Sequence, residues 1–275
     1  MAGYLSRGLA DIVAASTALS DVDGARGRLS YRGYDIHDLA SGATFEEVAY
    51  LLQRGSPPTP AELAAYRGEL AQARALLHAD HTMNASTSAA RVCAATLPDM
   101  HSAIIAALGA LKGRLHGGAN EQVMRTLEVI SKDAGGDAAV DAVEPEVRER
   151  LARGEKVMGF GHRVYKVEDP RATHLRQMSA ELGRASGGDT LYRMSQRMEE
   201  VVFAAKGLYP NVDFYAASVY RYLGVPVDLF TPVFSVSRMA GWTAHVMEQH
   251  AGRLIRPDSE YAGERGLTWP PLAAR

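Results

Sequence analysis

The sequence predicts an all-α protein, because most segments place apolar residues at helical spacing between capping residues and glycines. Hardly any segment shows the period-two alternation that a half-buried strand requires. The 275 residues fit one large domain or two modest ones, and a hydrophobic content of 47% is ample for a core. We therefore expect a globular, helical chain.

The N-terminal part combines a short extended segment with two helix starts. A turn is expected at 21–24 and an extended piece at 28–33. The sequences Thr44-Phe-Glu-Glu47 and Thr59-Pro-Ala-Glu62 are capping boxes, the second with proline at the first helical position. Each box predicts the start of a helix.

The later helices are predicted from apolar spacing, from prolines and caps at their starts, and from glycines at their ends. In chain order, helices are expected over 45–54, 60–77, 102–111, 121–132, 145–153, 170–182, 191–206, 212–223 and 232–250. Small residues dominate 84–96, Leu97-Pro-Asp99 breaks this pattern, and the buried helix that ends at Leu111 follows.

Domain boundaries are faint, being marked only by Gly-Gly-Asp loops within 134–137 and 186–189. A smaller helical domain is placed at 146–210. Residues 1–145 and 211–275 are assigned to a larger helical domain. The larger domain is thus expected to contain both ends of the chain.

The charge balance narrows the classes of partner. Thirty basic and 32 acidic residues give a net charge of −2, so no nucleic acid or membrane partner is expected, and an anionic ligand must be bound by local arginines. The single Cys93 excludes an internal disulfide and is expected to be an inert core thiol. No secretion signal or membrane-spanning run is recognised, so a cytoplasmic protein is expected.

A candidate site is organised around His116, which lies between two predicted helices. Gly113 is expected to end the buried helix before it, and Asn120 to begin the next helix. Gly117 and Gly118 allow a sharp turn and a close approach of a ligand to the backbone. Taken alone, a His-Gly-Gly turn is more often a plain helix connector.

A second glycine turn, 159–161, delivers His162. Lys166 and Arg171 add positive charge within a few residues, so the turn could hold a phosphate or a carboxylate. It is neither a dinucleotide fingerprint nor a P-loop, because no strand precedes it and the third glycine is missing.

Two further stretches carry histidine or carboxylate at a helix edge. His78 and His81 are three residues apart, without the His-Glu-x-x-His arrangement of a zinc site, and cysteine is scarce, so no metal is expected. Asp213 follows Pro210-Asn211 at a helix N-terminus, where taken alone a capping role is the simpler interpretation.

Together these stretches resemble, in order, the motifs of the citrate synthase family. The resemblance covers nearly the whole chain and is carried by Tyr31-Arg-Gly-Tyr34, Leu77-His-Ala-Asp-His81, Leu111-Lys-Gly-Arg-Leu-His-Gly-Gly-Ala-Asn120, Met158-Gly-Phe-Gly-His-Arg-Val-Tyr-Lys166, Asp169-Pro-Arg171, Pro210-Asn-Val-Asp-Phe-Tyr215, Phe230-Thr-Pro-Val-Phe234 and Arg253-Leu-Ile-Arg-Pro257. It implies an all-helical two-domain acyltransferase, usually a homodimer, that condenses an acyl-CoA with a 2-oxo acid and converts the acyl group to an alkyl group. CoA is then a cosubstrate, and no cofactor is permanently bound.

The resemblance also implies roles for individual residues. Asp213 resembles the carboxylate that removes a methyl proton from acetyl-CoA, His116 the donor to the thioester oxygen, and His162 the group that polarises and protonates the oxaloacetate carbonyl. The implied substrate ligands are His81, Arg171, Arg238 and Arg256, with Arg256 serving the neighbouring subunit's site. The implied CoA-binding positions are Val157, Met158, Gly159, Gly161 and Lys166.

Two departures from the family pattern bear on these roles. Between a helix ending near Ala75 and Leu77 the family carries on the order of a hundred further residues of the large domain, which are absent here. The approach to Arg256 is about one residue shorter than in the family. The missing block is expected to uncover apolar faces, notably on 102–111, and so to promote association.

The preferred function is citrate synthase. The runner-up is 2-methylcitrate synthase, which uses propionyl-CoA; one methylene in the acyl pocket is worth only about 1–3 kcal/mol, and no residue decides between the two. From a different class, the alternative is a truncated, catalytically impaired paralogue that acts as a helical binding or scaffold protein.

Overall fold

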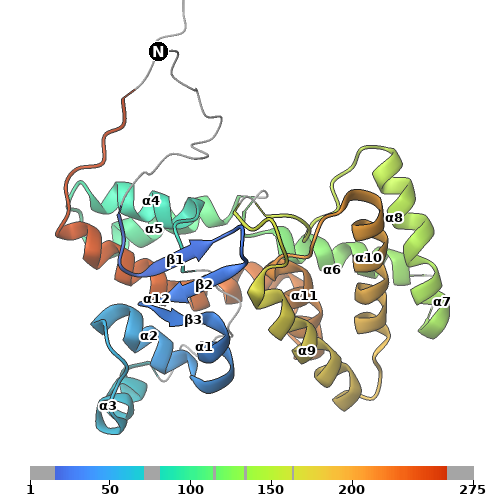
Figure 1. Cartoon of the computed structure of the whole chain (residues 1–275), viewed down its shortest axis with the longest axis horizontal. Coiled ribbons are helices and arrows are strands. Elements are labelled where there is room, and N and C mark those ends of the chain that lie inside the picture. The colour runs from blue at the N-terminus through green and yellow to red at the C-terminus, as the bar shows by residue number, and fades with distance from the viewer. Residues whose placement is uncertain (1–15, 71–80, 114–115, 133–134, 163, 259–275) are drawn as a thin grey trace, which may run out of the picture.

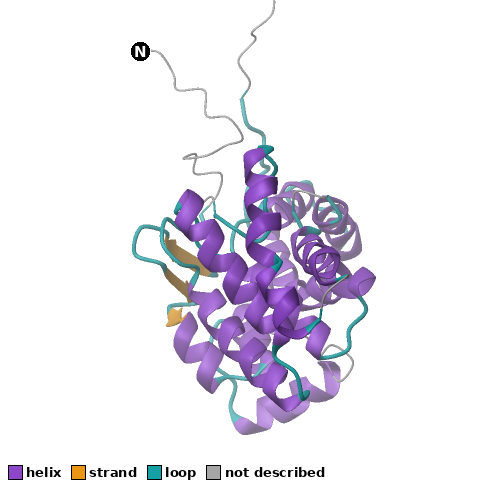
Figure 2. Ribbon diagram, turned by 90° about the vertical axis from the view of Figure 1, so that its right-hand side faces the viewer, coloured by secondary structure: helices purple, strands orange, loops and turns teal. Residues whose placement is uncertain are grey.

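The structure is a computed structural model that describes residues 16–70, 81–113, 116–132, 135–162 and 164–258. This part of the chain is mainly helical, with a small sheet at one side (Figure 2), so the predicted all-α class is confirmed. The helices are α1 (Ile36–Gly42), α2 (Phe45–Arg54), α3 (Pro60–Leu70), α4 (Ala85–Ala94), α5 (Met100–Leu111), α6 (Ala119–Ser131), α7 (Gly136–Asp141), α8 (Val143–Ala152), α9 (Pro170–Ala185), α10 (Thr190–Lys206), α11 (Val212–Tyr222) and α12 (Phe230–His250). A 3-10 turn, Val227–Leu229, precedes α12. None of the helices described has the length and hydropathy to cross a membrane.

The sheet has three antiparallel strands that precede the helices. β1 (Ser20–Asp23) pairs with β2 (Arg28–Tyr31), and β2 pairs with β3 (Tyr34–Asp35). The turn expected at 21–24 is therefore wrong for its first three residues, which are strand. The turn lies later because the Asp23 carboxylate accepts two backbone N–H groups just beyond β1.

The predicted capping boxes are both present. The N–H of Glu47 donates to Thr44 Oγ1 at 3.4 Å, and the N–H of Thr44 donates to Glu47 Oε2 at 2.7 Å. Gly55 caps the other end of α2 with a φ of 89°. A second box of the same kind opens α3, whose predicted continuation to Leu77 lies outside the described residues.

Three helices, α1, α4 and α7, are not among the ranges predicted from the sequence. Asp35 opens α1, because its side chain accepts the N–H of His37 at 2.8 Å. α7 occupies part of the loop expected at 134–137. The bounds of the other predicted helices from 102 onwards agree with the structure to within three residues.

The hydrophobic clusters do not follow the predicted domain boundaries. The largest runs from Val123 in α6 to Phe230 at the start of α12, and it includes residues of α9, α10 and α11. It therefore continues across the boundaries placed at 145 and 210. The division into 1–145, 146–210 and 211–275 stays a prediction.

α4 and α5 lie against α12 (Figure 1). Several of the side chains at this contact are small. Four alanines at this contact are fully shielded from solvent: Ala90, Ala94, Ala103 and Ala107. They share a cluster with Phe234 and Trp242 of α12. Because alanine lets helix axes approach closely, the N-terminus of α4 is brought beside α12.

A histidine pair joins α1 to α9. His37 Nδ1 and His174 Nε2 lie 2.9 Å apart. One nitrogen must donate and the other accept, so at least one ring is neutral. Burial lowers the pKa of His174, and the charge of His37 lowers it further.

We expect acidification to weaken this contact. Since the pKa of His174 is lowered in the folded chain, the unfolded chain takes up the proton first. The contribution of the His37–His174 contact to the free energy of unfolding is therefore complete above the ordinary histidine pKa of about 6.5 and is lost as the pH falls below it.

Between about pH 7.5 and 5.5, the melting temperature of the wild type should fall further than that of His174→Gln, which keeps a polar side chain without a titratable charge. His101→Gln, at an exposed histidine, should behave as the wild type. Equal falls in the wild type and His174→Gln would contradict the role of the pair.

Candidate active site

His116 lies in a turn that folds back on the end of α5. Its N–H donates to the Gly113 carbonyl at 2.9 Å, and the N–H of Gly117 donates to the Leu111 carbonyl at 2.9 Å. A Cβ on Gly117 would lie 2.4 Å from that Leu111 oxygen, so a side chain does not fit there. The turn thus places His116 just before the start of α6.

The prediction that Asn120 begins α6 is wrong. Gly118 occupies the cap position, and no side chain caps it. Asn120 lies in the first turn, fully buried, where its Oδ1 accepts the N–H of Glu121 at 2.8 Å. An asparagine buried within the first turn and one at the cap look alike in a sequence.

The imidazole of His116 reaches the N-terminus of α4. The backbone N–H of Ser86 donates to His116 Nε2 at 3.2 Å, and Ser86 Oγ lies 2.9 Å from the same nitrogen. A backbone N–H can only donate, so Nε2 accepts and Nδ1 carries the ring proton. His116 is therefore a neutral imidazole whose hydrogen-bond donor is Nδ1–H.

Arg238 joins this group from α12. Its side chain is buried, and Nη1 donates to Ser86 Oγ at 3.2 Å and lies 3.4 Å from His116 Nε2. The guanidinium carbon lies 4.1 Å from the centroid of the Phe234 ring. Segments far apart in the sequence therefore meet at Ser86, a residue to which the sequence analysis assigns no role.

The side chain of His81 packs against α12 at Gly241, one helical turn from Arg238. A Cβ on Gly241 would lie 2.4 Å from His81 Nδ1, so the imidazole rests directly on the helix backbone. Tyr31 contacts the same ring edge-on, with centroids 5.3 Å apart. Arg238 and Gly241 are three residues apart and so share a face of α12. His81, which packs on Gly241, therefore lies on the same side of the helix as Arg238.

His162 is fixed by the backbone that follows it. Its Nδ1 accepts the N–H groups of Val164 and Tyr165, at 3.1 and 3.2 Å. The ring proton is therefore on Nε2, and His162 is a second neutral imidazole with one N–H donor. The buried ring of Tyr165 lies 4.6 Å from it, centroid to centroid.

Three hydrogen bonds tie the glycine turn 159–161 to the segment that opens α11. The N–H of Gly161 donates to the Tyr209 carbonyl at 2.8 Å. The N–H of Asn211 donates to the Gly159 carbonyl at 2.9 Å, and its Nδ2 to the Gly161 carbonyl at 3.0 Å. The loop with the second imidazole is thus attached to the start of α11.

Asp213 lies in the first turn of α11 and is half-buried. Asn211 is the cap, because its Oδ1 accepts the N–H of Asp213 at 3.0 Å. The carboxylate of Asp213 is therefore not the helix cap that the simpler interpretation expects. Burial raises the pKa of Tyr220 on the same helix, and the charge of Asp213 raises it further.

Arg171 is buried and paired with Asp169. Its Nε and Nη2 donate to Asp169 Oδ1 and Oδ2 at 2.9 and 2.7 Å. Asp169 Oδ1 also accepts the N–H of Arg171 and so caps α9. Asp169 occupies the Nε edge of the guanidinium, so a substrate carboxylate would bind at the opposite edge. No role for Asp169 is predicted from the sequence.

The positions assigned to CoA differ in their surroundings. Val157 and Met158 pack partly buried against the largest hydrophobic cluster. Gly159 has a φ of 87°, and a Cβ there would lie 2.7 Å from Val123 and 2.9 Å from Phe214, so glycine is required. The turn therefore packs tightly on α6 and α11.

Lys166 and Arg256 lie at the surface. The exposed Lys166 donates its backbone N–H to the Gly24 carbonyl at 2.8 Å. Arg256 lies in an exposed segment after α12, and no hydrogen bond in the described part of the chain joins it to the other candidate residues. Its role at a neighbouring subunit's site stays a prediction.

The described contacts form two groups that Tyr31 connects. His81, Ser86, His116 and Arg238 form the first group, and the His162 loop with the start of α11 forms the second. Tyr31 contacts His81 and shares a hydrophobic cluster with Tyr165, the ring neighbour of His162. A cavity of about 450 Å³ lies elsewhere, beside Arg91 and Glu248.

No group of three or more metal-binding side chains is found in the described part of the chain. His78, weighed above as a metal ligand, lies outside that part.

Comparison with known proteins agrees with these motifs. The family model described as citrate synthase, C-terminal domain, matches residues 8–77 and 75–258. The chain belongs to the citrate synthase family.

Relatives in this family cover the chain to different extents. Citrate synthase 2 of Bacillus subtilis is 51% identical over 84% of this chain, and the chain spans 59% of its length. The citrate synthase of Haloferax volcanii is 37% identical, with an alignment of 385 residues that spans 100% of both chains. A 2-methylcitrate synthase of Shewanella oneidensis is 34% identical over 98% of this chain and 97% of its own.

A solved structure of the family has the same fold. It is the citrate synthase of Thermoplasma acidophilum in a ternary complex with carboxymethyl coenzyme A and oxaloacetate. It matches with a TM-score of 0.85 and 28% identity, over 98% of this chain and 99% of that one. The citrate-synthase-like fold is therefore confirmed.

The chain is shorter than these relatives, as its alignment with the Haloferax enzyme shows. The Haloferax alignment has 385 positions against 275 residues here, a difference of about 110 positions. The two matches to the family model meet at 75–77, where the sequence predicts the missing block. The join lies outside the described residues.

We expect the N-terminal hairpin to fix the position of the His162 loop, because Gly24 packs against the Val164 carbonyl. A substitution of Gly24 tests this expectation. A Cβ on Gly24 would lie 2.0 Å from the Val164 carbonyl oxygen, so Gly24→Ala must displace the backbone that holds His162 Nδ1. We expect a cost of about 1–3 kcal/mol, a fall of several degrees in melting temperature. We also expect the NMR signal of the His162 ring to shift. Gly42→Ala, at a glycine with nothing within 4 Å, should change neither property. A His162 signal that does not move in Gly24→Ala would contradict the prediction.

Proposed function

We propose that this chain condenses acetyl-CoA with oxaloacetate to form citrate and CoA. The observation that carries the proposal is the protonation state of two imidazole rings, those of His116 and His162. Backbone N–H groups donate to His116 Nε2 and to His162 Nδ1, so each ring is neutral and has one N–H for a substrate oxygen. Two such donors, together with the half-buried carboxylate of Asp213, match a reaction that makes one enol and consumes one carbonyl.

Each residue then has one chemical task. Asp213 removes a proton from the acetyl methyl group, while His116 Nδ1–H donates to the thioester oxygen as negative charge develops there. The enol carbon attacks the keto carbon of oxaloacetate, and His162 Nε2–H donates to the oxygen that becomes a hydroxyl. Water then cleaves the thioester, which releases citrate and CoA.

Buried arginines suit the dicarboxylate substrate. Arg171 and Arg238 are both buried, so their charges are screened little by solvent. Asp169 fixes the fork of Arg171, and Ser86 and Phe234 fix that of Arg238. Planar guanidinium groups held in this way can bind carboxylates at two points, which lysine cannot.

The acyl substrate has a second candidate. A relative named 2-methylcitrate synthase aligns over nearly the whole chain, so propionyl-CoA is the alternative acyl donor. In either case the CoA thioester is a cosubstrate, and the proposed steps use no permanently bound cofactor. Enzymes of this class are acyltransferases that convert the acyl group to an alkyl group.

The test of this function is release of free thiol from acetyl-CoA, with and without oxaloacetate, in the wild type and in Asp213→Asn. Removing the base should lower turnover by roughly 10²–10⁴-fold and leave CoA binding nearly unchanged, because the substitution is almost isosteric. Asp228→Asn, at an exposed aspartate just before α12, is the matched control and should retain full activity.

Other results of the thiol-release assay would indicate a different function. Faster release from propionyl-CoA than from acetyl-CoA would indicate a 2-methylcitrate synthase. Release that does not depend on oxaloacetate would indicate a thioesterase. No release by a folded, dimeric wild type would favour the impaired paralogue, and full activity in Asp213→Asn would return Asp213 to a structural role.

Self-association is part of the proposal, because α4 and α5 expose apolar side chains. Ile105 is 67% exposed and Leu108 39%, both on α5, and Leu97 beyond α4 is 70% exposed. At roughly 25 cal/mol per Å², covering even a few hundred Å² of such surface gains several kcal/mol. We infer that two copies cover this surface in a homodimer.

Light scattering tests the dimer. The wild type should have twice the molar mass of the chain, and Ile105→Glu should lower it toward the monomer, because a charge cannot be buried unpaired in an apolar contact. Val129→Glu, at a residue of α6 that is 58% exposed, is the matched control and should remain dimeric. A monomeric wild type with full activity would contradict both the dimer and the assignment of Arg256 to a neighbouring site.

A further inference from the structure

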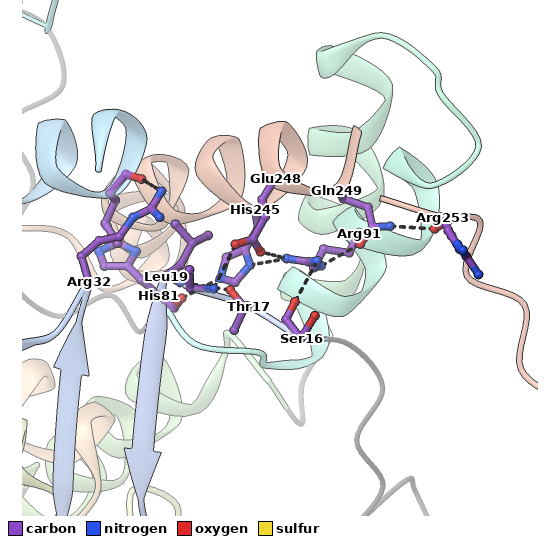
Figure 3. Close-up of polar contacts among 12 residues, drawn as sticks. Ser16, Thr17, Leu19, Arg32, His81, Arg91, His245, Glu248, Gln249 and Arg253 are labelled. Atoms are coloured by element: carbon purple, nitrogen blue, oxygen red, sulfur yellow. Dashed lines mark hydrogen bonds and ion pairs between the residues drawn. The ribbon is translucent and has the colours of Figure 1, made fainter. Parts of the chain in front are cut away.

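The backbone of His81 is held from both sides. Its N–H donates to the hydroxyl of Tyr31 at 3.3 Å. On the other side, its carbonyl oxygen lies 2.8 Å from His245 Nε2 (Figure 3). His245 is fully buried in α12. A carbonyl can only accept, so His245 Nε2 carries a proton and donates it to His81.

Arg91 fixes the other nitrogen of His245. Arg91 Nη1, on α4, lies 3.1 Å from His245 Nδ1 (Figure 3). A guanidinium can only donate, so Nδ1 accepts, and His245 is neutral with its single proton on Nε2. Arg91 therefore selects the tautomer that binds the His81 carbonyl.

Arg91 is itself held by α12. Its Nε donates to Gln249 Oε1 at 3.0 Å, and Nη1 forms an ion pair with Glu248. Burial opposes the charge of Glu248, but the N–H of Ala18 and the Arg91 guanidinium outweigh it and lower the pKa of Glu248. The guanidinium thus has a fixed orientation (Figure 3).

We propose that Arg91 and His245 are positioning residues for His81, which hold its backbone so that its imidazole stays on α12 at Gly241, beside Arg238. The proposal rests on the proposed function, in which His81 binds oxaloacetate. The two residues contact the His81 main chain or each other, so they act on the substrate only through His81.

The position of His81 in the chain makes this support important. His81 is the first described residue after the segment 71–80, in which the internal block of the family is missing. The anchors of His81 come instead from β2, α4 and α12. The orientation of the imidazole therefore depends on contacts that the shortened chain retains.

The test uses His245→Leu, which removes the donor, and His245→Gln, whose amide places a donor near the former Nε2. Losing one buried hydrogen bond predicts an increase of about three- to tenfold in the oxaloacetate KM and Kd for His245→Leu. Its kcat and its KM for acetyl-CoA should stay within about twofold. His245→Gln should recover most of the oxaloacetate affinity. His250→Leu, an exposed histidine at the end of the same helix, is the matched control and should match the wild type.

NMR of the histidine rings gives a readout that does not need activity. The His81 signal, assigned by its loss in His81→Gln, should shift in His245→Leu and keep its wild-type position in His245→Gln and His250→Leu. If His245→Leu does not fold, failure of His245→Gln to retain the His81 signal and the oxaloacetate Kd overturns the proposal. Equal losses for both substrates also overturn it. A wild type that binds no oxaloacetate overturns the proposed function, while the ring signals still decide whether His245 positions His81.

Discussion

The close packing of α4 and α5 on α12 is the constraint on which the first group of site residues depends. Alanines on α4 and α5 fill the contact with almost no side-chain volume, so the first turn of α4 lies against α12. Ser86 in that turn then reaches both Arg238 and His116. A larger residue in place of Ala90 would separate the helices, and the donor to His116 would move away with α4.

The use of the main chain as donor explains how two histidines stay neutral in a site that also contains buried arginines. A backbone N–H cannot accept a proton or a hydrogen bond, so each bond from Ser86, Val164 or Tyr165 forces the imidazole nitrogen that it meets to accept. Side-chain donors such as a hydroxyl can reverse their role, whereas these cannot. The glycines at 117 and 159 are needed for close packing beside the two histidines, because a Cβ would meet the Leu111 carbonyl at the first position and the side chains of Val123 and Phe214 at the second.

The fold class and most helix ranges follow from the sequence, because caps, glycines and apolar spacing are local signals. The candidates His162 and Asp213 are recognisable for the same reason, since each lies at a glycine turn or a helix start. Ser86 and Asp169 are not recognisable, because their roles consist of contacts with other site residues that spacing alone does not reveal. Asn120 is a different case, because the sequence predicts a helix cap there. In the structure Gly118 is the cap, and Asn120 is buried in the first turn of α6.

The contacts that hold the described candidate residues come from elements other than the missing block. Arg238, Gly241 and His245 all belong to α12, and the donor to His116 belongs to α4, downstream of the join at 75–77. Upstream of the join, the hairpin contributes Tyr31 to His81 and Gly24 to the His162 loop. The absence of the block is expected to affect stability and association before it affects the geometry of the described side chains.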